Sequence, residues 1–139
     1  MKLSTEGLES LFDDLTAVME LPDSVVLDML TAEGEVIAAA QTAEAKTMGV
    51  FDTGTTASSI IVEKKLKTSG QTRSLLVKPN GNRTDGNKRR IAEVAFINEF
   101  GKAGQPARPF IGTANEKSAD AAVEAAADVY DRYLKAQNL

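Results

Sequence analysis

The chain has 139 residues, of which 42% are hydrophobic and 26% are charged, a balance typical of one soluble globular domain spanning 1–139. It contains no cysteine and no histidine, which excludes disulfides, thiolate metal sites and catalysis by histidine. No stretch approaches the ~20 apolar residues of a membrane span, and the first residues lack the apolar region of a signal peptide. We therefore expect neither membrane insertion nor secretion.

The net charge of -4 is unevenly distributed along the chain. Residues 1–62 carry eleven acids and two basic residues, whereas residues 63–102 carry ten basic residues and four acids. The middle of the chain is thus a basic region in an acidic protein. Such a region is either a solvated sheet face, whose lysines discourage edge pairing, or a contact surface for an acidic partner or nucleic acid.

Two helices are predicted in the acidic part. Apolar residues at spacings of three and four predict an amphipathic helix over 8–19. Asp23 or Ser24 is predicted to cap a second helix that ends near Thr47. Gly34 weakens this helix by about 1 kcal/mol relative to alanine, which permits a bend there. The expected inner face consists of Val26, Leu27, Leu30, Ile37 and Ala40, and Ala45 could extend it.

A β-hairpin is predicted in the basic region. The β-branched and alternating residues of 59–68, a turn at 69–71 and a second run over 73–78 are typical of two paired strands. The polar, basic segment 79–90 is predicted to be a long exposed loop. A loop is also predicted in the threonine- and serine-rich stretch around Gly54.

The last third of the chain begins with 91–100, whose apolar positions fit a short helix or a strand equally well. A turn over 101–104 follows, and Thr113 or Asn115 is predicted to cap a last helix that reaches about Lys135. Its expected inner face is Ala119, Ala122, Val123, Ala126, Tyr130, Tyr133 and Leu134. The order of elements predicts an α+β fold with helices packed on one side of a small antiparallel β-sheet and a long C-terminal helix.

The most distinctive segment is 97–110, which contains Ile-Asn-Glu-Phe-Gly and then Pro-Ala-Arg-Pro-Phe. Two prolines bracket Ala107–Arg108 and favour an extended backbone. Phe110 is expected to anchor the start of the last helix in the core. Arg108, with little backbone entropy left to lose, suits a bidentate pair with a carboxylate, and Glu99 of the same or a neighbouring subunit is the candidate partner.

No set of residues elsewhere in the chain predicts catalysis. The sequence lacks a phosphate-binding loop and a nucleotide-binding glycine fingerprint. Asp13 and Asp14 are adjacent on one helix and point in different directions, and Glu93 and Glu99 have no partner that would make a reactive carboxylate pair. We therefore predict that the protein is not an enzyme, needs no cofactor or metal, and acts through a surface.

The sequence Glu-Phe-Gly at 99–101, a short glycine-containing spacer and Pro-Ala-Arg-Pro-Phe at 106–110 resemble the tail-component family of long-tailed bacteriophages and prophages. Members are also described as tail-completion or neck proteins. The motif covers 97–110, and the order of helices, basic hairpin, motif and helix agrees over most of the chain. Lys102 departs from the small hydroxylated residue that often follows the glycine. We assign the structural anchors of the motif as Phe100, Gly101, Pro109 and Phe110.

The resemblance implies a structural virion protein at the head–tail junction that forms a ring, expected to be sixfold, and completes the tail or its attachment. Its implied partners are copies of itself, head-connector proteins, and tail-tube or terminator proteins, with DNA only passing through the channel. Assembly would take place in the cytoplasm of the host bacterium. A tail-terminator ring protein and a small non-virion nucleic-acid-binding protein are the alternatives.

The charge distribution gives an independent argument for a ring. A subunit with an acidic face and a basic face favours head-to-tail contacts, which close into a ring when the rotation permits. We predict that helices within 1–47 of one subunit meet the hairpin and loop within 63–90 of its neighbour, and that salt weakens assembly. The nucleic-acid alternative would use Lys64, Lys65, Lys67, Arg73, Lys88, Arg89 and Arg90. The predicted interface residues are Glu99, Arg108, Lys64, Lys65, Lys67, Lys88, Arg89 and Arg90.

Overall fold

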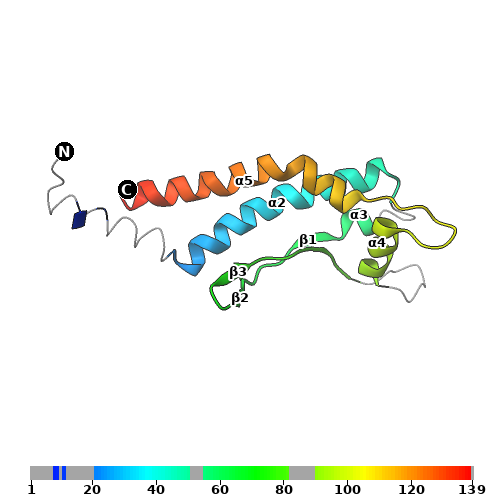
Figure 1. Ribbon diagram of the computed structural model, residues 1–139, viewed down its shortest axis with the longest axis horizontal. Helices are drawn as coiled ribbons and strands as arrows, with labels where there is room; N and C mark the ends of the chain where they lie inside the picture. The colour runs from blue at the N-terminus through cyan, green and yellow to red at the C-terminus, as the bar shows by residue number, and fades with distance from the viewer. Residues whose placement is uncertain (1–7, 10, 12–20, 51–54, 82–89, 139) are drawn as a thin grey trace.

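The computed structural model describes residues 8, 9, 11, 21–50, 55–81 and 90–138. Its elements in chain order are α2 (Asp23–Thr47), α3 (Thr55–Ser58), β1 (Ile60–Val62), β2 (Lys67–Ser69), β3 (Thr72–Ser74), β4 (Val77–Pro79), α4 (Ile91–Phe100) and α5 (Phe110–Ala136). The long helices α2 and α5 lie side by side, and the strands form an arm along α2 (Figure 1). The predicted α+β fold with a long C-terminal helix is therefore confirmed. No helix in these ranges is long and apolar enough to cross a membrane.

Small residues make the contact between α2 and α5. The buried positions of α5 repeat every four residues, so they form one row along the helix: Phe110, Ala114, Ser118, Ala122 and Ala126. The buried positions of α2 are Gly34, Gln41 and Ala45. Across this contact, Gln41 Nε2 donates a hydrogen bond to Asn115 Oδ1 at 2.9 Å. Because most of these side chains are small, the two helix backbones can approach closely.

The inner face predicted for α5 is only partly correct. Ala122 and Ala126 are buried, and Tyr130 is half-buried, as predicted. Ala119 and Val123, however, are exposed, and Val123 keeps 63% of its surface accessible. Both lie one position beyond the buried row, and this turns them about 100° away from α2.

The predicted hairpin is present, but it is divided into two short ladders. β1 pairs with β4 in antiparallel register, with Val62 opposite Val77, and β2 pairs with β3, with Lys67 opposite Ser74. Between these pairs, four residues of one strand (63–66) face two residues of the other. The extra residues interrupt the ladder as a bulge does, which divides the arm into an inner and an outer part.

Gly34 lies where the arm crosses α2. A Cβ atom at this position would lie 2.9 Å from Val62 Cγ1 and 3.3 Å from Val77 Cγ2. The two valines are cross-strand partners and face the helix together. We predicted that Gly34 permits a bend, whereas in the structure it provides the space in which the arm contacts α2.

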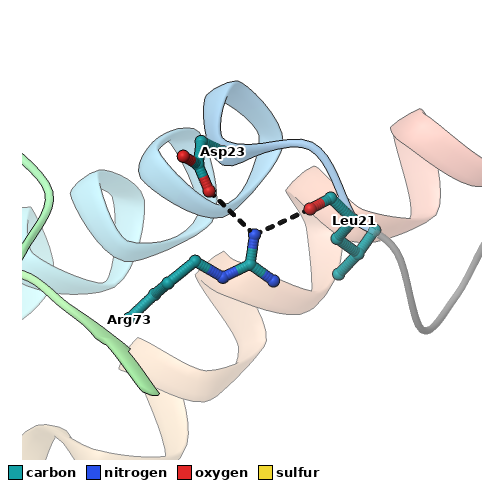
Figure 2. Close-up of polar contacts among 3 residues, drawn as sticks. All are labelled: Leu21, Asp23 and Arg73. Atoms are coloured by element: carbon teal, nitrogen blue, oxygen red, sulfur yellow. Dashed lines mark hydrogen bonds and ion pairs between the residues drawn. The ribbon is translucent and has the colours of Figure 1, made fainter. Parts of the chain in front are cut away.

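The outer part of the arm is attached to the start of α2 by a polar contact. Arg73 of β3 donates from Nη1 to the carbonyl oxygen of Leu21 at 2.7 Å and to Asp23 Oδ1 at 3.1 Å (Figure 2). The arm therefore runs along α2 towards its N-terminus. A contact between the acidic helix and the basic hairpin, which we predicted between subunits, is thus made within one subunit at this point.

The apolar core lies at the other end of α2. Phe110 is 0% exposed and packs with the buried residues Ala45, Val50 and Ala95. Met48, Ile60 and Ile111 are partly buried against this cluster. Four elements of the fold thus meet at one aromatic ring: the C-terminal end of α2, β1, α4 and the start of α5.

Several local predictions are wrong at helix termini. The N-cap of α2 is Pro22, and neither Asp23 nor Ser24 caps the helix. α5 begins at Phe110 and not at Thr113 or Asn115. Residues 55–58, expected to lie in a loop, form the short helix α3.

Two other predictions have different outcomes. Residues 91–100, for which helix and strand were both open, form a helix. The helix predicted over 8–19 lies outside the described residues except for Leu8, Glu9 and Leu11, which are helical.

The Gly34 contact predicts a conditional effect of alanine. In the wild-type background, Gly34→Ala should destabilise the protein by about 1 kcal/mol or more, because overpacking outweighs the gain of about 1 kcal/mol in helix propensity. In a Val62→Ala background, the same change should become neutral or stabilising. Urea denaturation of the four proteins of this double-mutant cycle measures both effects, and equal effects in the two backgrounds would contradict the close contact.

Candidate assembly site

Helix α4 presents two different faces. Ile91, Ala95 and Asn98 are buried, whereas Phe96 and Phe100 are 63% and 68% exposed. The two exposed rings contact each other, with centroids 4.8 Å apart and planes inclined by 49°. We had assigned Phe100 as a structural anchor, and this assignment is wrong. A helix that buries Ala95 and Asn98 directs position 100 towards solvent.

The turn after α4 requires glycine at position 101. Gly101 has a φ angle of +77°, and a Cβ atom there would lie 2.9 Å from the nitrogen of Ala107 and 3.0 Å from the oxygen of Gln105. The positive φ angle and the short distances to neighbouring backbone atoms both exclude a side chain at position 101. Lys102 and Gln105 then exchange two backbone hydrogen bonds, of 3.0 Å and 2.9 Å, which confirms the predicted turn. Gly101 is thus a structural residue of the segment, as predicted.

The chain then returns to α4 and turns sharply into α5. The amide of Arg108 donates to the carbonyl oxygen of Asn98 at 2.6 Å. The amide of Phe110 donates to the oxygen of Arg108 at 2.8 Å, and Pro109 has φ -78° and ψ 66°, the geometry of an inverse γ-turn. Proline favours this turn because its ring fixes φ, so Pro109 directs the chain into the buried Phe110.

The carboxylate of Glu99 caps helix α5. Glu99 Oε2 accepts from the amide of Ile111 at 2.8 Å, and Oε1 accepts from the amide of Gly112 at 2.9 Å. These are the second and third residues of α5, whose amides have no acceptor within the helix. The negative charge also lies at the positive end of the helix dipole. The structure therefore gives Glu99 a capping role that the sequence did not indicate.

Arg108 does not pair with Glu99 in the same subunit. Both Glu99 oxygens are engaged by α5, and Arg108 Nη1 donates instead to the carbonyl oxygen of Gly49 at 3.0 Å. That carbonyl lies just beyond the C-terminal end of α2, where the helix dipole favours a cation. Arg108 is exposed, and a guanidinium has five N–H donors, so most of its donors face solvent. The intersubunit role of Arg108 remains a prediction.

The predicted basic residues differ in their environments. Lys64 and Lys65 are exposed and have no ion pair within the described residues. Lys67 and Lys78 both lie beside Glu63, and the hydrogen bond from Lys78 lowers the pKa of that carboxyl group.

The remaining basic residues lie near α4. Arg90 Nε is 3.4 Å from Glu93 Oε1. Lys88 and Arg89 lie outside the described residues. Among the described residues, the structure does not bring the predicted interface residues into one patch. Lys64 and Lys65 lie on the arm between β1 and β2, whereas Arg108 is bonded to Asn98 of α4 and to Gly49 beyond the end of α2.

Sequence reasoning missed Phe96, which completes the exposed aromatic pair. The signal was present, because Phe96 and Phe100 are four residues apart and such positions are neighbours on a helix. Recognising this pair required the prediction that 91–100 is a helix, and the sequence left helix and strand both open. Within the described part of the chain, no three acidic side chains are placed to hold a metal ion.

The capping role of Glu99 predicts a loss of stability rather than of assembly. Glu99→Ala should lower the free energy of unfolding by about 1–2 kcal/mol, since it removes the acceptor for two helix amides. Glu93→Ala is the matched control on the same helix, and it should cost less than about 1 kcal/mol because its ion pair is exposed. Denaturant unfolding measures both. An unchanged stability of Glu99→Ala together with lost self-association would instead favour Glu99 as an intersubunit residue.

The segment that connects α4 to α5 is thus a rigid unit. It has three fixed points: the obligatory Gly101, the γ-turn at Pro109 and the cap from Glu99. Beside it, Arg108 and the aromatic pair are exposed.

No protein-family model, curated protein or solved structure matches this chain.

Proposed function

We propose that the protein is a structural subunit of the head–tail junction of a long-tailed bacteriophage, where it forms a ring that joins or completes the tail and lets DNA pass. The observation that carries this proposal is the segment 96–110, which holds the aromatic pair of Phe96 and Phe100 and Arg108 at the surface. The family resemblance of the same residues supplies the biological setting. In this proposal the segment is an assembly element and not part of an active site.

The energy available from the aromatic pair suits an assembly contact. A phenylalanine side chain buries roughly 150–250 Å², so covering the exposed parts of Phe96 and Phe100 removes roughly 250 Å² from water. At about 25 cal/mol per Å², this contributes about 6 kcal/mol before the costs of association. Aromatic residues are also enriched at the energetic centres of protein interfaces. Such a contribution is large enough to decide whether subunits associate.

Rigidity of the segment supports the same proposal. Backbone hydrogen bonds at Asn98 and Lys102, together with the Glu99 cap, fix the loop before any partner binds. A preorganised surface loses little conformational entropy on association, so more of its contact energy appears as affinity. Arg108 adds charge-assisted hydrogen bonding to a carboxylate of a neighbouring subunit.

The direct test is negative-stain microscopy of the purified full chain at low salt, in which rings are expected. A tail-terminator position in the virion would also give rings, and co-assembly with head-connector or tail-tube proteins distinguishes the two positions. A gel shift with duplex DNA tests the nucleic-acid alternative. Tight DNA binding by the monomer without rings would contradict our proposal. Of the basic residues in that alternative, Arg73 donates to Leu21 and Asp23 and Lys67 lies beside Glu63, whereas Lys64 and Lys65 have no ion pair within the described residues.

The aromatic pair generates one prediction. The double variant Phe96→Ser, Phe100→Ser should weaken self-association by about a hundredfold, since it removes most of the apolar area of the contact. Its stability should change by less than about 0.5 kcal/mol, because both rings are exposed in the monomer. Sedimentation velocity measures association and urea denaturation measures stability. Phe96→Leu, Phe100→Leu is the matched control, which keeps apolar area and should retain most of the association.

Arg108 and Phe110, two positions apart, predict opposite phenotypes. Phe110→Ala should lower the free energy of unfolding by about 3–5 kcal/mol because the ring is fully buried. Arg108→Ala should leave the fold intact, at a cost of about 1 kcal/mol for its bond to Gly49, and should impair ring formation. Lys102→Ala is the control for an exposed charge in the same segment. An Arg108→Ala protein that assembles fully would exclude the intersubunit role.

A further inference from the structure

The subunit has two outer faces that point in opposite directions. α2 forms the middle layer, with α5 packed on one side and the arm on the other (Figure 1). The outer side of α5 and the outer side of the arm are therefore the two broad surfaces that α2 does not cover. Their side chains differ in charge, and both include exposed apolar residues.

The outer side of α5 carries a row of carboxylates. Four acids follow one another at intervals of four residues, and all four are exposed: Glu116, Asp120, Glu124 and Asp128. They lie two positions beyond the buried row of α5, on the opposite side of the helix. None of them has an ion pair within the described residues. The exposed Val123 and Ala119 lie between them, and we call these six residues the acidic face.

The arm has the opposite charge. The arm carries five basic residues and one acid between Ile60 and Pro79. Because Val62 and Val77 face α2, the alternation of strand residues directs Ile61 and Leu76 outward, and both are exposed. Lys64 and Lys65 lie in the bulge between the two ladders, exposed and unpaired within the described residues. We call Ile61, Leu76, Lys64 and Lys65 the basic face.

The basic face is short enough to lie within the acidic face. The row from Glu116 to Asp128 spans twelve residues of helix, or about 18 Å at 1.5 Å per residue. The bulge shortens the stretch from Ile61 to Lys67, because the partner strand covers it in four steps, from Lys78 to Ser74, or about 13 Å at 3.3 Å per residue. An exposed aliphatic residue accompanies the charges on each face, so a contact between them would bury apolar surface and pair opposite charges together.

We infer that the basic face of one subunit docks on the acidic face of a second copy of this chain. The occupant is another copy because the complementary faces lie on opposite sides of the same molecule, which generates a head-to-tail contact that repeats. This inference deepens the proposed function and rests on it, since it adds a second contact between subunits of the ring to the one that the aromatic pair and Arg108 make. It replaces the predicted contact with the acidic helix α2, whose Asp23 is already engaged by the arm of its own subunit.

Charge reversal tests the inference with full-length protein. Lys64→Glu, Lys65→Glu makes the arm acidic, and Asp120→Lys, Glu124→Lys makes the outer side of α5 basic. Each variant alone should self-associate at least about tenfold more weakly in sedimentation velocity at low salt, because like charges then face each other. An equimolar mixture should recover association, since each acidic arm meets a basic α5 and each acidic α5 meets a basic arm. The four reversals combined in one chain should also recover it.

Reversals at other exposed positions are the matched controls. Lys46→Glu, Lys135→Glu and Asp28→Lys, Glu35→Lys change the net charge by the same amounts away from both faces and from the segment that connects α4 to α5. These controls should associate as the wild type does, and circular dichroism checks that every variant is folded. Controls that weaken association equally, or reversed proteins that do not recover on mixing, would overturn the inference.

Cysteine crosslinking separates failure of the inference from failure of the proposed function. The chain has no cysteine, so Lys65→Cys and Glu124→Cys introduce single thiols. Oxidation of a mixture should give a disulfide between positions 65 and 124 of different subunits, in preference to either homodimer. Rings without this crosslink would overturn the inference and leave the proposed function standing. The crosslink in open filaments without rings would support the inference and contradict ring formation.

Discussion

Burial of the Phe110 ring is the interaction on which the remaining architecture depends. The ring packs against Ala45 and Val50 at the end of α2 and against Ala95 of α4, so it joins three segments that are distant in sequence. Only 5% of the chain is aromatic, and the other buried hydrophobic residues that the structure describes are mostly alanine. One fully buried phenylalanine contributes about 2–3 kcal/mol relative to exposure, a large share for such a core. The packing of Phe110 against Ala95 therefore fixes the direction in which α4 presents Phe96 and Phe100.

The other end of the molecule depends on a polar contact of a different kind. Arg73 holds the outer part of the arm to the start of α2 through the carbonyl oxygen of Leu21 and the carboxylate of Asp23 (Figure 2). The Asp23 side chain is 75% exposed, so this ion pair contributes little in water. A hydrogen bond from a charged donor to a backbone carbonyl contributes more, about 1.5–3 kcal/mol. The carbonyl of Leu21 is thus the more important partner, and the attachment should resist salt better than an ion pair alone.

Local patterns in the sequence predicted the elements of the fold. The features that were predicted wrongly depend on contacts between residues that are distant in sequence. The second helix, the hairpin and the last helix were correct because each depends on its own periodicity and turn residues. The start of α5 was wrong because its cap, Glu99, lies eleven residues before Phe110 and on another helix. Hydrophobicity alone could not predict that Phe110 is buried and Phe100 is exposed, since this difference depends on how α4 packs. Gly34 was interpreted by its helix propensity because the arm that contacts it begins 26 residues later.

The spacing of the buried row on α5 has a consequence for the shape of the subunit. The row repeats every four residues, whereas the helix repeats every 3.6, so the row winds around the helix axis. α2 follows it closely over only part of its length, and the two helices diverge towards the C-terminal end of α5 (Figure 1). Alanines line the narrow part, and the half-buried Tyr130 and Tyr133 lie towards the wider end. The pair of helices is therefore tapered. In the proposed ring, tapered subunits packed side by side would each be rotated relative to the last, so the positions of a few alanines and tyrosines would set the curvature of the ring.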